Sequence, residues 1–295
     1  MNRLSILLML LPMLMFQRPV SAEEPSATIA KIKQSGQITL GVRESSPPFS
    51  FVESGQQSAK GYSLDICAKI IDAIAKEAKI AKLDVKQVVV TPSNRMAKLA
   101  DGTIDLECGS TTNTEARAKE VSFSYTTFIT GTRFLVKKSS HIQTIQDLKG
   151  KVVVSTAGTN NEKVVTKFAL DNSLGFVMKS AKDHAESFSL VQSNAATAFA
   201  MDDILLAGLI SKSSNPSEYE IIGNYLSIEP YGLMMRKDDK SFIKVVDNAI
   251  VGLFHSGEIN KIYEKWFITS NLTFPMPSLM KEVVRTPSKE PAWPR

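Results

Sequence analysis

Cysteine, histidine and tryptophan are scarce in this sequence, which has two cysteines, three histidines and two tryptophans among its 295 residues. The histidines lie far apart, at positions 141, 184 and 255, and no Cys-x-x-Cys or His-Glu-x-x-His motif gives the spacing of metal ligands. A Gly-x-Ser-x-Gly elbow, a P-loop and a Gly-x-Gly-x-x-Gly turn are also missing. We therefore expect no metal, no cofactor and no catalytic residues.

Long hydrophobic runs are missing after the N-terminus. Residues 4–16 form an apolar run that follows a short basic start at Arg3 and precedes the small residues Val20-Ser21-Ala22. This order is typical of a secretory signal peptide, here residues 1–22, and the run is too short to span a bilayer comfortably. No cysteine stands at the predicted cleavage point to carry a lipid. We expect an exported, soluble protein.

The chain also lacks a strong excess of charge. Removal of residues 1–22 takes away Arg3 and Arg18 and no acidic residue, which leaves 33 basic against 30 acidic residues and a net charge of +3. This charge is too mild, and the lysines are too scattered among acidic residues, for a protein that binds nucleic acid.

The two cysteines leave two alternatives open. Cys67 falls on a helix pattern and Cys108 on a strand pattern. In an oxidising compartment they either form a disulfide or serve as small core residues.

Strand and helix patterns alternate along most of the chain. Strands are predicted at 37–42, 84–90, 103–108, 151–155, 175–179, 197–201, 219–222 and 231–236. Helices are predicted at 27–35, 64–79, 94–100, 162–170, 183–192, 204–210, 242–255 and 258–266. The alternation predicts an α/β fold with mainly parallel sheets covered by helices on both faces.

The pattern divides the mature chain into two units, with a change near 127–132 and a return near 226–231. We expect a first lobe from residues 23–128 and 229–274 and a second lobe from residues 129–228. The tail at 275–295 has five prolines and little pattern, and we expect it to be poorly ordered.

Polar segments gather where predicted strands end. Four of them directly follow four strands: Arg43, Ser110 to Thr112, Thr156 to Thr159, and Asp202. In open α/β sheets, ligands bind beyond the C-terminal ends of the strands. We therefore expect these segments to face one ligand site.

Arg95 and Arg117 stand where helices are predicted to begin. A cation there is unfavourable by a few tenths up to ~1 kcal/mol, but hydroxyls, free N–H groups and a guanidinium together suit a carboxylate. Together with Arg43, these arginines would repel one another unless anions compensate them. Asp202 would suit an ammonium group. Two carboxylates and one ammonium describe an acidic amino acid.

The sequence resembles the family-3 extracellular solute-binding proteins of bacterial ABC importers from about residue 28 to residue 274. The motifs that resemble the family as a whole are Gly61-Tyr62-Ser63-x-Asp65, Asp147-Leu148-Lys149-Gly150-Lys151, Ser256-Gly257-Glu258 and Trp266-Phe267. Five further segments resemble its glutamate/aspartate-binding branch: Val42-Arg43-Glu44-Ser45-Ser46-x-Pro48-Phe49-Ser50, Ser93-Asn94-Arg95, Glu107-Cys108-Gly109-Ser110-Thr111-Thr112-Asn113, Ser180-Ala181-Lys182-Asp183-His184 and Met201-Asp202-Asp203.

The resemblance implies a two-lobe periplasmic-binding-protein fold of type II, with two crossing strands as a hinge and the ligand cleft between the lobes. It implies a periplasmic monomer that captures L-glutamate and/or L-aspartate and delivers it to an inner-membrane ABC permease complex. One methylene is worth only ~1–3 kcal/mol in a pocket, so the sequence does not rank the two ligands.

The resemblance also implies a role for each site residue. Arg117 would clamp the α-carboxylate, assisted from the first lobe by Ser110 and Thr112 and from the second by Thr156 and Thr159.

Asp202 would take the α-ammonium, with Asp203 as a competing candidate. The side-chain carboxylate would be held by Arg43, Arg95 and His184. Either Thr91 or Ser93 would supply a hydroxyl near Arg95.

Three alternatives stay open at this point. The same fold hosts cyclohexadienyl or arogenate dehydratase-like enzymes, which need a general acid such as His184 or Glu107. The chain could also bind another polar amino acid, or form a sensor module.

Overall fold

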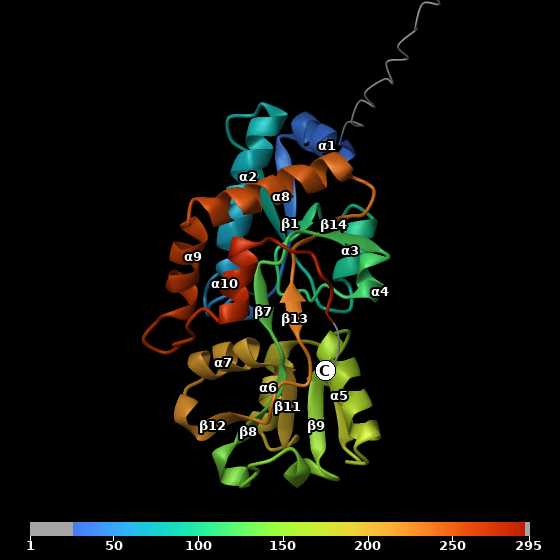
Figure 1. Cartoon of the computed structure of the whole chain (residues 1–295), viewed down its shortest axis with the longest axis vertical. Helices are drawn as coiled ribbons and strands as arrows, with labels where there is room; N and C mark the ends of the chain where they lie inside the picture. Colours follow the sequence, from blue (N-terminus) through green and yellow to red (C-terminus); the bar gives the residue numbers. More distant parts are fainter. Residues whose placement is uncertain (1–25, 293–295) are drawn as a thin grey trace, which may run out of the picture.

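The computed structural model describes residues 26–292, so the predicted signal peptide lies outside the described residues. The chain builds two five-stranded sheets, each in its own lobe, with helices packed around them (Figure 1). The two-lobe α/β architecture expected from the sequence is therefore confirmed.

The first lobe is built on the sheet β4-β1-β5-β14-β6. Its strands are β1 (Gln37–Val42), β4 (Asp84–Val89), β5 (Leu106–Glu107), β6 (Val121–Phe123) and β14 (Met234–Arg236), with a small hairpin of β2 (Ser45–Ser46) and β3 (Ser50–Phe51). Its helices are α1 (Ala27–Ser35), α2 (Tyr62–Ala78), α3 (Arg95–Ala100), α4 (Glu115–Ala118), α8 (Lys240–His255), α9 (Glu258–Phe267) and α10 (Ser278–Arg285).

The second lobe is built on the sheet β10-β9-β11-β8-β12. Its strands are β8 (Thr132–Lys137), β9 (Val152–Thr156), β10 (Val177–Ala181), β11 (Ala198–Asp202) and β12 (Tyr219–Ile222). Its helices are α5 (Asn160–Asp171), α6 (His184–Gln192) and α7 (Asp203–Lys212), with 3-10 turns at Lys138–Ser140, Gln146–Leu148 and Pro216–Glu218.

Two antiparallel strands connect the lobes. These are β7 (Phe128–Thr130) and β13 (Glu229–Tyr231), which pair with each other and belong to neither large sheet. They lie where the sequence predicted the change and the return, and Figure 1 shows them running between the upper and the lower lobe.

The prediction of mainly parallel sheets was wrong, because half of the strand pairs within the two large sheets are antiparallel. The pairs of β1 with β4 and β5 are parallel, as are those of β9 with β10 and β11. The pairs that involve β8 and β14 are antiparallel. Both of these strands directly follow a crossing strand, so the chain enters each sheet from the hinge rather than from a helical crossover.

Helix α2 shows how the sequence builds the first core. Ile66, Ile70 and Ile74 repeat every four residues, and all three are fully buried. The helix begins after Gly61, which has a φ of 143° and lies so close to Phe49 that a Cβ would come within 2.2 Å of the Phe49 carbonyl oxygen. Only glycine fits this approach.

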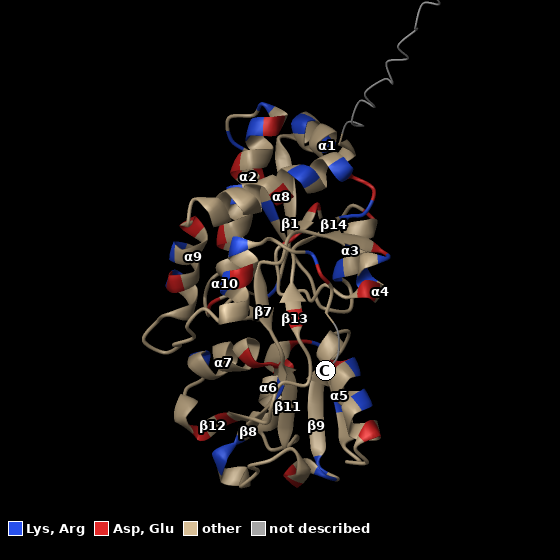
Figure 2. Ribbon diagram, viewed as in Figure 1, with Lys and Arg blue, Asp and Glu red and all other residues tan. Residues whose placement is uncertain are grey.

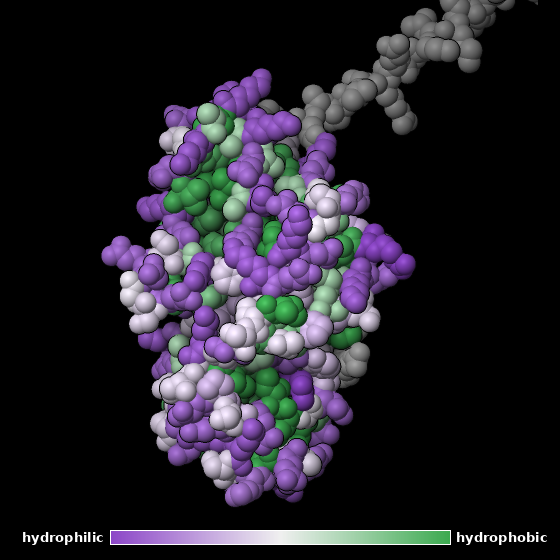
Figure 3. Space-filling model, turned by 90° about the vertical axis from the view of Figure 1, so that its left-hand side faces the viewer, coloured by the Kyte–Doolittle hydropathy of each residue, from purple (hydrophilic) through white to green (hydrophobic). Residues whose placement is uncertain are grey.

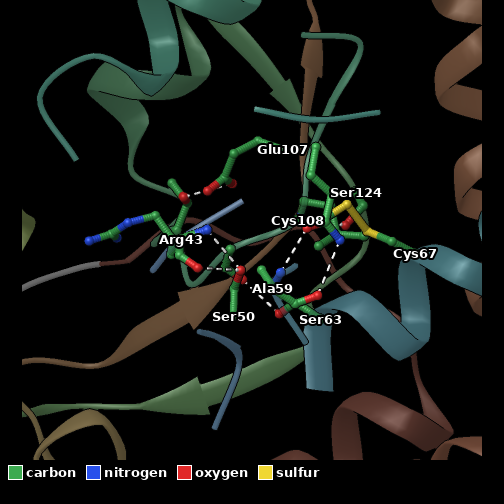
Figure 4. The surroundings of a disulfide bond; sticks show 12 residues. Arg43, Ser50, Ala59, Ser63, Cys67, Glu107, Cys108 and Ser124 are labelled. Carbon is green, nitrogen blue, oxygen red and sulfur yellow. Dashed lines mark hydrogen bonds between the residues drawn. A yellow bond between two sulfur atoms is a disulfide. The ribbon is translucent and has the colours of Figure 1, made fainter. Parts of the chain in front are cut away.

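A disulfide joins Cys67 on α2 to Cys108, the residue directly after β5, with 6.4 Å between the two Cα atoms. The structure thus decides between the two alternatives that the sequence left open (Figure 4). The bond fixes the start of the polar loop 109–114 to the core helix of the first lobe.

Replacing both cysteines by alanine is expected to lower the free energy of unfolding by about 3–4 kcal/mol, because the disulfide closes a loop with a sequence separation of 41 residues. Denaturant titrations of the variant and of the oxidised wild type measure this difference. Wild type under a strong reductant should match the variant. Identical midpoints for all three samples would contradict the prediction.

The tail predicted to be poorly ordered is instead folded onto the first lobe. Helix α10 buries Met280 and Val283, three residues apart, in the core of that lobe. The chain then returns to the polar loop, where the Asn113 amide donates to the Lys289 carbonyl (2.9 Å) and the Ala292 N–H donates to the Asn113 carbonyl (2.7 Å). The prolines of this segment indicate a tail without regular structure, yet Ser278–Arg285 form a short amphipathic helix.

Charged side chains lie mainly on the outer helices and loops, while the sheet strands are largely free of them (Figure 2). The face shown in Figure 3 is mostly hydrophilic, with hydrophobic residues in scattered areas. Arg43 and Arg95 depart from this pattern, because each is charged but only 2% exposed.

Candidate functional site

A small cavity, with about 220 Å³ of empty space when the solvent at its open side is included, lies between the two lobes. Its lining contains every predicted site residue except Thr156: Arg43, Arg95, Ser110, Thr112, Arg117, Thr159, His184 and Asp202. Pro92, Asn160, Asn161, Met201 and Leu205 complete the lining. The polar strand ends of both lobes therefore meet at one place.

Arg43 and Arg95 bring unsatisfied hydrogen-bond donors to this cavity. Among the described residues, the buried Arg43 Nη2, Arg95 Nε, Arg95 Nη1 and Ser110 Oγ atoms find no hydrogen-bond partner. Burial and the neighbouring Arg95 lower the pKa of Arg43 to about 9. Since an unsatisfied buried donor costs ~1–3 kcal/mol, more when it is charged, this group of donors favours an anionic ligand.

Arg117 bridges the two lobes. Its Nη1 donates to the Thr112 carbonyl (2.9 Å) in its own lobe, and its Nη2 donates to the Gly158 carbonyl (3.0 Å) across the cleft. Burial and Arg95 lower its pKa to about 10. Helix α4 has only four residues, so the helix-dipole argument from the sequence carries little weight here.

The structure separates the two neighbouring aspartates. The Asp202 carboxylate lines the cavity and accepts from the Asn161 amide (2.6 Å) and from the Tyr231 hydroxyl. The Asp203 carboxylate lies outside the lining and accepts from the hydroxyls of Thr130 (2.6 Å) and Tyr225 (2.5 Å). Burial and the nearby Glu229 carboxylate raise the pKa of Asp202. An ammonium group would relieve that repulsion.

His184 begins helix α6 directly after its N-cap, Asp183, whose side chain accepts from the Glu186 N–H. The Nδ1 atom of its buried ring is 2.8 Å from the Thr156 hydroxyl, which also contacts the Ser187 hydroxyl at 2.8 Å. Thr156 therefore lies behind the histidine instead of in the cavity lining. Burial, Arg43 and Arg95 lower the pKa of His184.

The lowered pKa of His184 gives a pH-dependence of stability. Because the folded protein binds this proton more weakly than the unfolded chain, wild type should lose stability relative to His184→Gln as the pH falls below ~6.5. The loss should reach up to ~1.4 kcal/mol per pH unit. Urea titrations of both proteins, without added ligand, between pH 5 and pH 8 measure it. A difference that does not change with pH would refute the prediction.

The loop before Arg95 contributes to contact between the lobes. Pro92 lines the cavity, while the Ser93 hydroxyl donates to the Ala157 carbonyl (3.2 Å) of the second lobe. Thr91 is not part of the lining.

Three surrounding residues were not recognised as part of the site from the sequence. Glu229 accepts from the Asn160 amide (2.8 Å) and the Ser227 hydroxyl (2.5 Å), and Tyr231 donates to Asp202. Asn161 connects Asp202 to the Thr132 hydroxyl (2.7 Å). The available signal for Glu229 in the sequence was a charged residue within 226–231, where the chain is predicted to return to the first lobe.

Within residues 26–292, no group of His, Cys, Asp and Glu side chains is arranged to hold a metal ion. None of the helices in the same range has both the length and the apolar character needed to cross a membrane.

A ligand cavity between two α/β lobes joined by two crossing strands defines a two-lobe binding protein. Residues 38–269 match the bacterial extracellular solute-binding proteins, family 3, and the chain belongs to this family. The L-glutamate/L-aspartate-binding protein of Pseudomonas aeruginosa is 44% identical over 280 residues, which are 93% of this chain and 93% of that protein.

Two further relatives agree with this assignment. The glutamate/aspartate import solute-binding protein of Escherichia coli is 40% identical over 274 residues, which are 91% of this chain and 90% of that protein. The crystal structure of a mutant ArgBP from T. maritima matches this chain with a TM-score of 0.72 and 26% sequence identity. The match covers 82% of this chain and 100% of the ArgBP chain.

Proposed function

We propose that this protein binds L-glutamate and/or L-aspartate as the solute-binding component of an ABC importer. The observation that carries the proposal is the set of unsatisfied guanidinium donors facing a buried carboxylate, Asp202, in one cavity between the lobes. The names of the relatives from P. aeruginosa and E. coli support the choice of acidic amino acids.

The cavity suggests one orientation for the ligand. The α-carboxylate would bind Arg117 with the hydroxyls of Ser110, Thr112 and Thr159, and the α-ammonium would bind Asp202. The side-chain carboxylate would take the free donors of Arg43 and Arg95.

His184 would also contact the side-chain carboxylate. Thr156, expected as a direct contact, would act by orienting the His184 ring.

Capture would proceed by closure of the lobes over the ligand. Contacts that cross the cleft support a closed state: Arg117 with Gly158, Ser93 with Ala157, and Lys212 with Glu53 at 3.1 Å. The first lobe would comprise residues 23–128 and 229–274 together with the tail that packs onto it, and the second residues 129–228. The protein would act as a monomer in the periplasm and deliver its ligand to an inner-membrane permease complex.

The alternative of a dehydratase-like enzyme is less well supported. The Glu107 carboxylate, one candidate acid, lies outside the cavity lining and accepts from the Thr111 hydroxyl (2.9 Å). The other, His184, has a lowered pKa, which is unfavourable for a general acid near neutral pH. The relatives from P. aeruginosa and E. coli are named as binding proteins. We therefore propose binding without catalysis.

Isothermal titration of the mature protein with each of the twenty amino acids tests the proposal. Glutamate or aspartate should bind at least a hundredfold more tightly than glutamine or asparagine, since a neutral amide leaves charged donors unpaired. A neutral amino acid that binds as tightly as both acidic ones would refute it.

A further inference from the structure

Glu107 is a fully buried carboxylate placed directly behind the ligand cavity. It lies on β5, it is 0% exposed, and its Oε2 atom accepts from the Thr111 hydroxyl at 2.9 Å. Its Oε1 atom has no hydrogen-bond partner among the described residues and lies 3.8 Å from Arg95 Nη1. One carboxylate oxygen is therefore available to the guanidinium groups.

Gly109 leaves room for this carboxylate on the side of the aliphatic stem of Arg43. A Cβ at Gly109 would come within 2.2 Å of Glu107 Oε1 and 3.2 Å of Arg43 Cγ, so a larger residue there would displace the end of the Glu107 side chain. Figure 4 shows the Glu107 carboxylate near the stem of Arg43, whose guanidinium extends away to the left, while the disulfide of Cys108 lies on the right. The glycine thus lets the carboxylate and the first arginine share one buried region.

The other carboxylates at the cavity are held elsewhere. Asp202 accepts from Asn161 and Tyr231, and Glu229 accepts from Asn160 and Ser227. Burial lowers the pKa values of both Arg43 and Arg95, and Glu107 is the carboxylate that opposes this lowering most at each of them, ahead of Asp183 at Arg43 and Asp202 at Arg95.

We propose that Glu107 is a specificity-determining residue, an internal anion that competes with the side-chain carboxylate of the ligand for Arg43 and Arg95. This inference rests on the proposed function. Without a ligand, Glu107 compensates two buried guanidiniums. With an acidic ligand, a second carboxylate meets the same guanidiniums, and the two anions repel each other at low dielectric. Glu107 therefore limits the preference of the site for acidic over neutral side chains.

The test variant is Glu107→Gln, which keeps the shape of the side chain and an oxygen for the Thr111 hydroxyl. Isothermal titration should show glutamate binding about tenfold more tightly than to wild type, because the competing charge is gone. Glutamine should bind with unchanged affinity, within about twofold, because it carries no side-chain charge for Glu107 to repel. The thermal midpoint without added ligand should fall, since two buried arginines lose their counter-ion.

Asp105→Asn is the matched control. Asp105 is 1% exposed, lies two residues before Glu107, and pairs with Lys31 (2.9 Å) and Arg236 (3.0 Å) away from the cavity. This control should lower the thermal midpoint without changing either affinity. The contrast separates an effect at the ligand site from the general loss of a buried ion pair.

Glutamate affinity that falls or stays unchanged in Glu107→Gln would overturn the inference, and so would an equal gain for glutamine. If this variant does not fold, Glu107→Asp keeps the charge but draws it back by one methylene, and it should give a smaller gain of the same sign. Wild type that binds no acidic amino acid would instead refute the proposed function itself, before any variant is compared.

Discussion

Replacing Arg117 by alanine is expected to abolish measurable binding of every amino acid. The guanidinium is the proposed partner of the α-carboxylate, which all amino acids share, and its Nη2 also connects the lobes through the Gly158 carbonyl. Removal of one partner of a buried ion pair costs ~3–5 kcal/mol, or about a hundredfold to several thousandfold in affinity. Titrations with glutamate, aspartate and glutamine measure the loss.

Arg133→Ala provides the control for this variant. Arg133 donates to two backbone carbonyls, those of Gly223 (2.7 Å) and Ile221 (3.1 Å), but it does not line the cavity. The Arg133→Ala variant should be less stable than wild type and keep its affinity for ligands. Glutamine binding that survives in Arg117→Ala would contradict the role assigned to Arg117.

Replacing Arg95 by alanine should selectively weaken the binding of acidic ligands. Its free Nε and Nη1 donors are proposed to hold the side-chain carboxylate, so glutamate should lose about a hundredfold and glutamine only a few fold. Titration of both ligands against the variant gives the ratio. Equal losses for the two ligands would contradict the role assigned to Arg95.

Stability should fall in the same variant, because Glu107 loses the nearest of its two cations. Arg236→Ala is the matched control, since Arg236 pairs with the buried Asp105 at 3.0 Å and neither residue lines the cavity. Both variants should unfold at lower temperature, but only Arg95→Ala should change the ratio of glutamate to glutamine affinity.

Local patterns predicted the helices well and the sheet directions poorly. The predicted helix 27–35 coincides with α1, and the predicted helix at 258–266 ends one residue before α9 does. Apolar repeats along one face report a helix directly. The direction of a strand depends on where its partner lies, and β8 and β14 are reversed because the chain arrives from the hinge. No local sequence pattern records from which side the chain enters the sheet.

The residues that line the cavity were predictable for a similar reason. Polar residues that directly follow a strand must lie at the sheet edge, which was enough to bring Arg43, Ser110 and Asp202 together. Their individual roles came from the resemblance to a family. Glu107 and Glu229 lie behind the lining, where Glu107 accepts from Thr111 and Glu229 from Asn160, and a buried carboxylate has no sequence pattern of its own.

The folded tail has a practical consequence for reporter design. Residues 289–292 lie against Asn113, and Ala292 forms a parallel bridge with Thr114, three residues before Arg117. A fluorescent domain or purification tag fused to the C-terminus would therefore disturb the loop that is proposed to bind the ligand. Helix α1 lies at the opposite end of the first lobe in Figure 1, so a label attached there would leave the loop undisturbed.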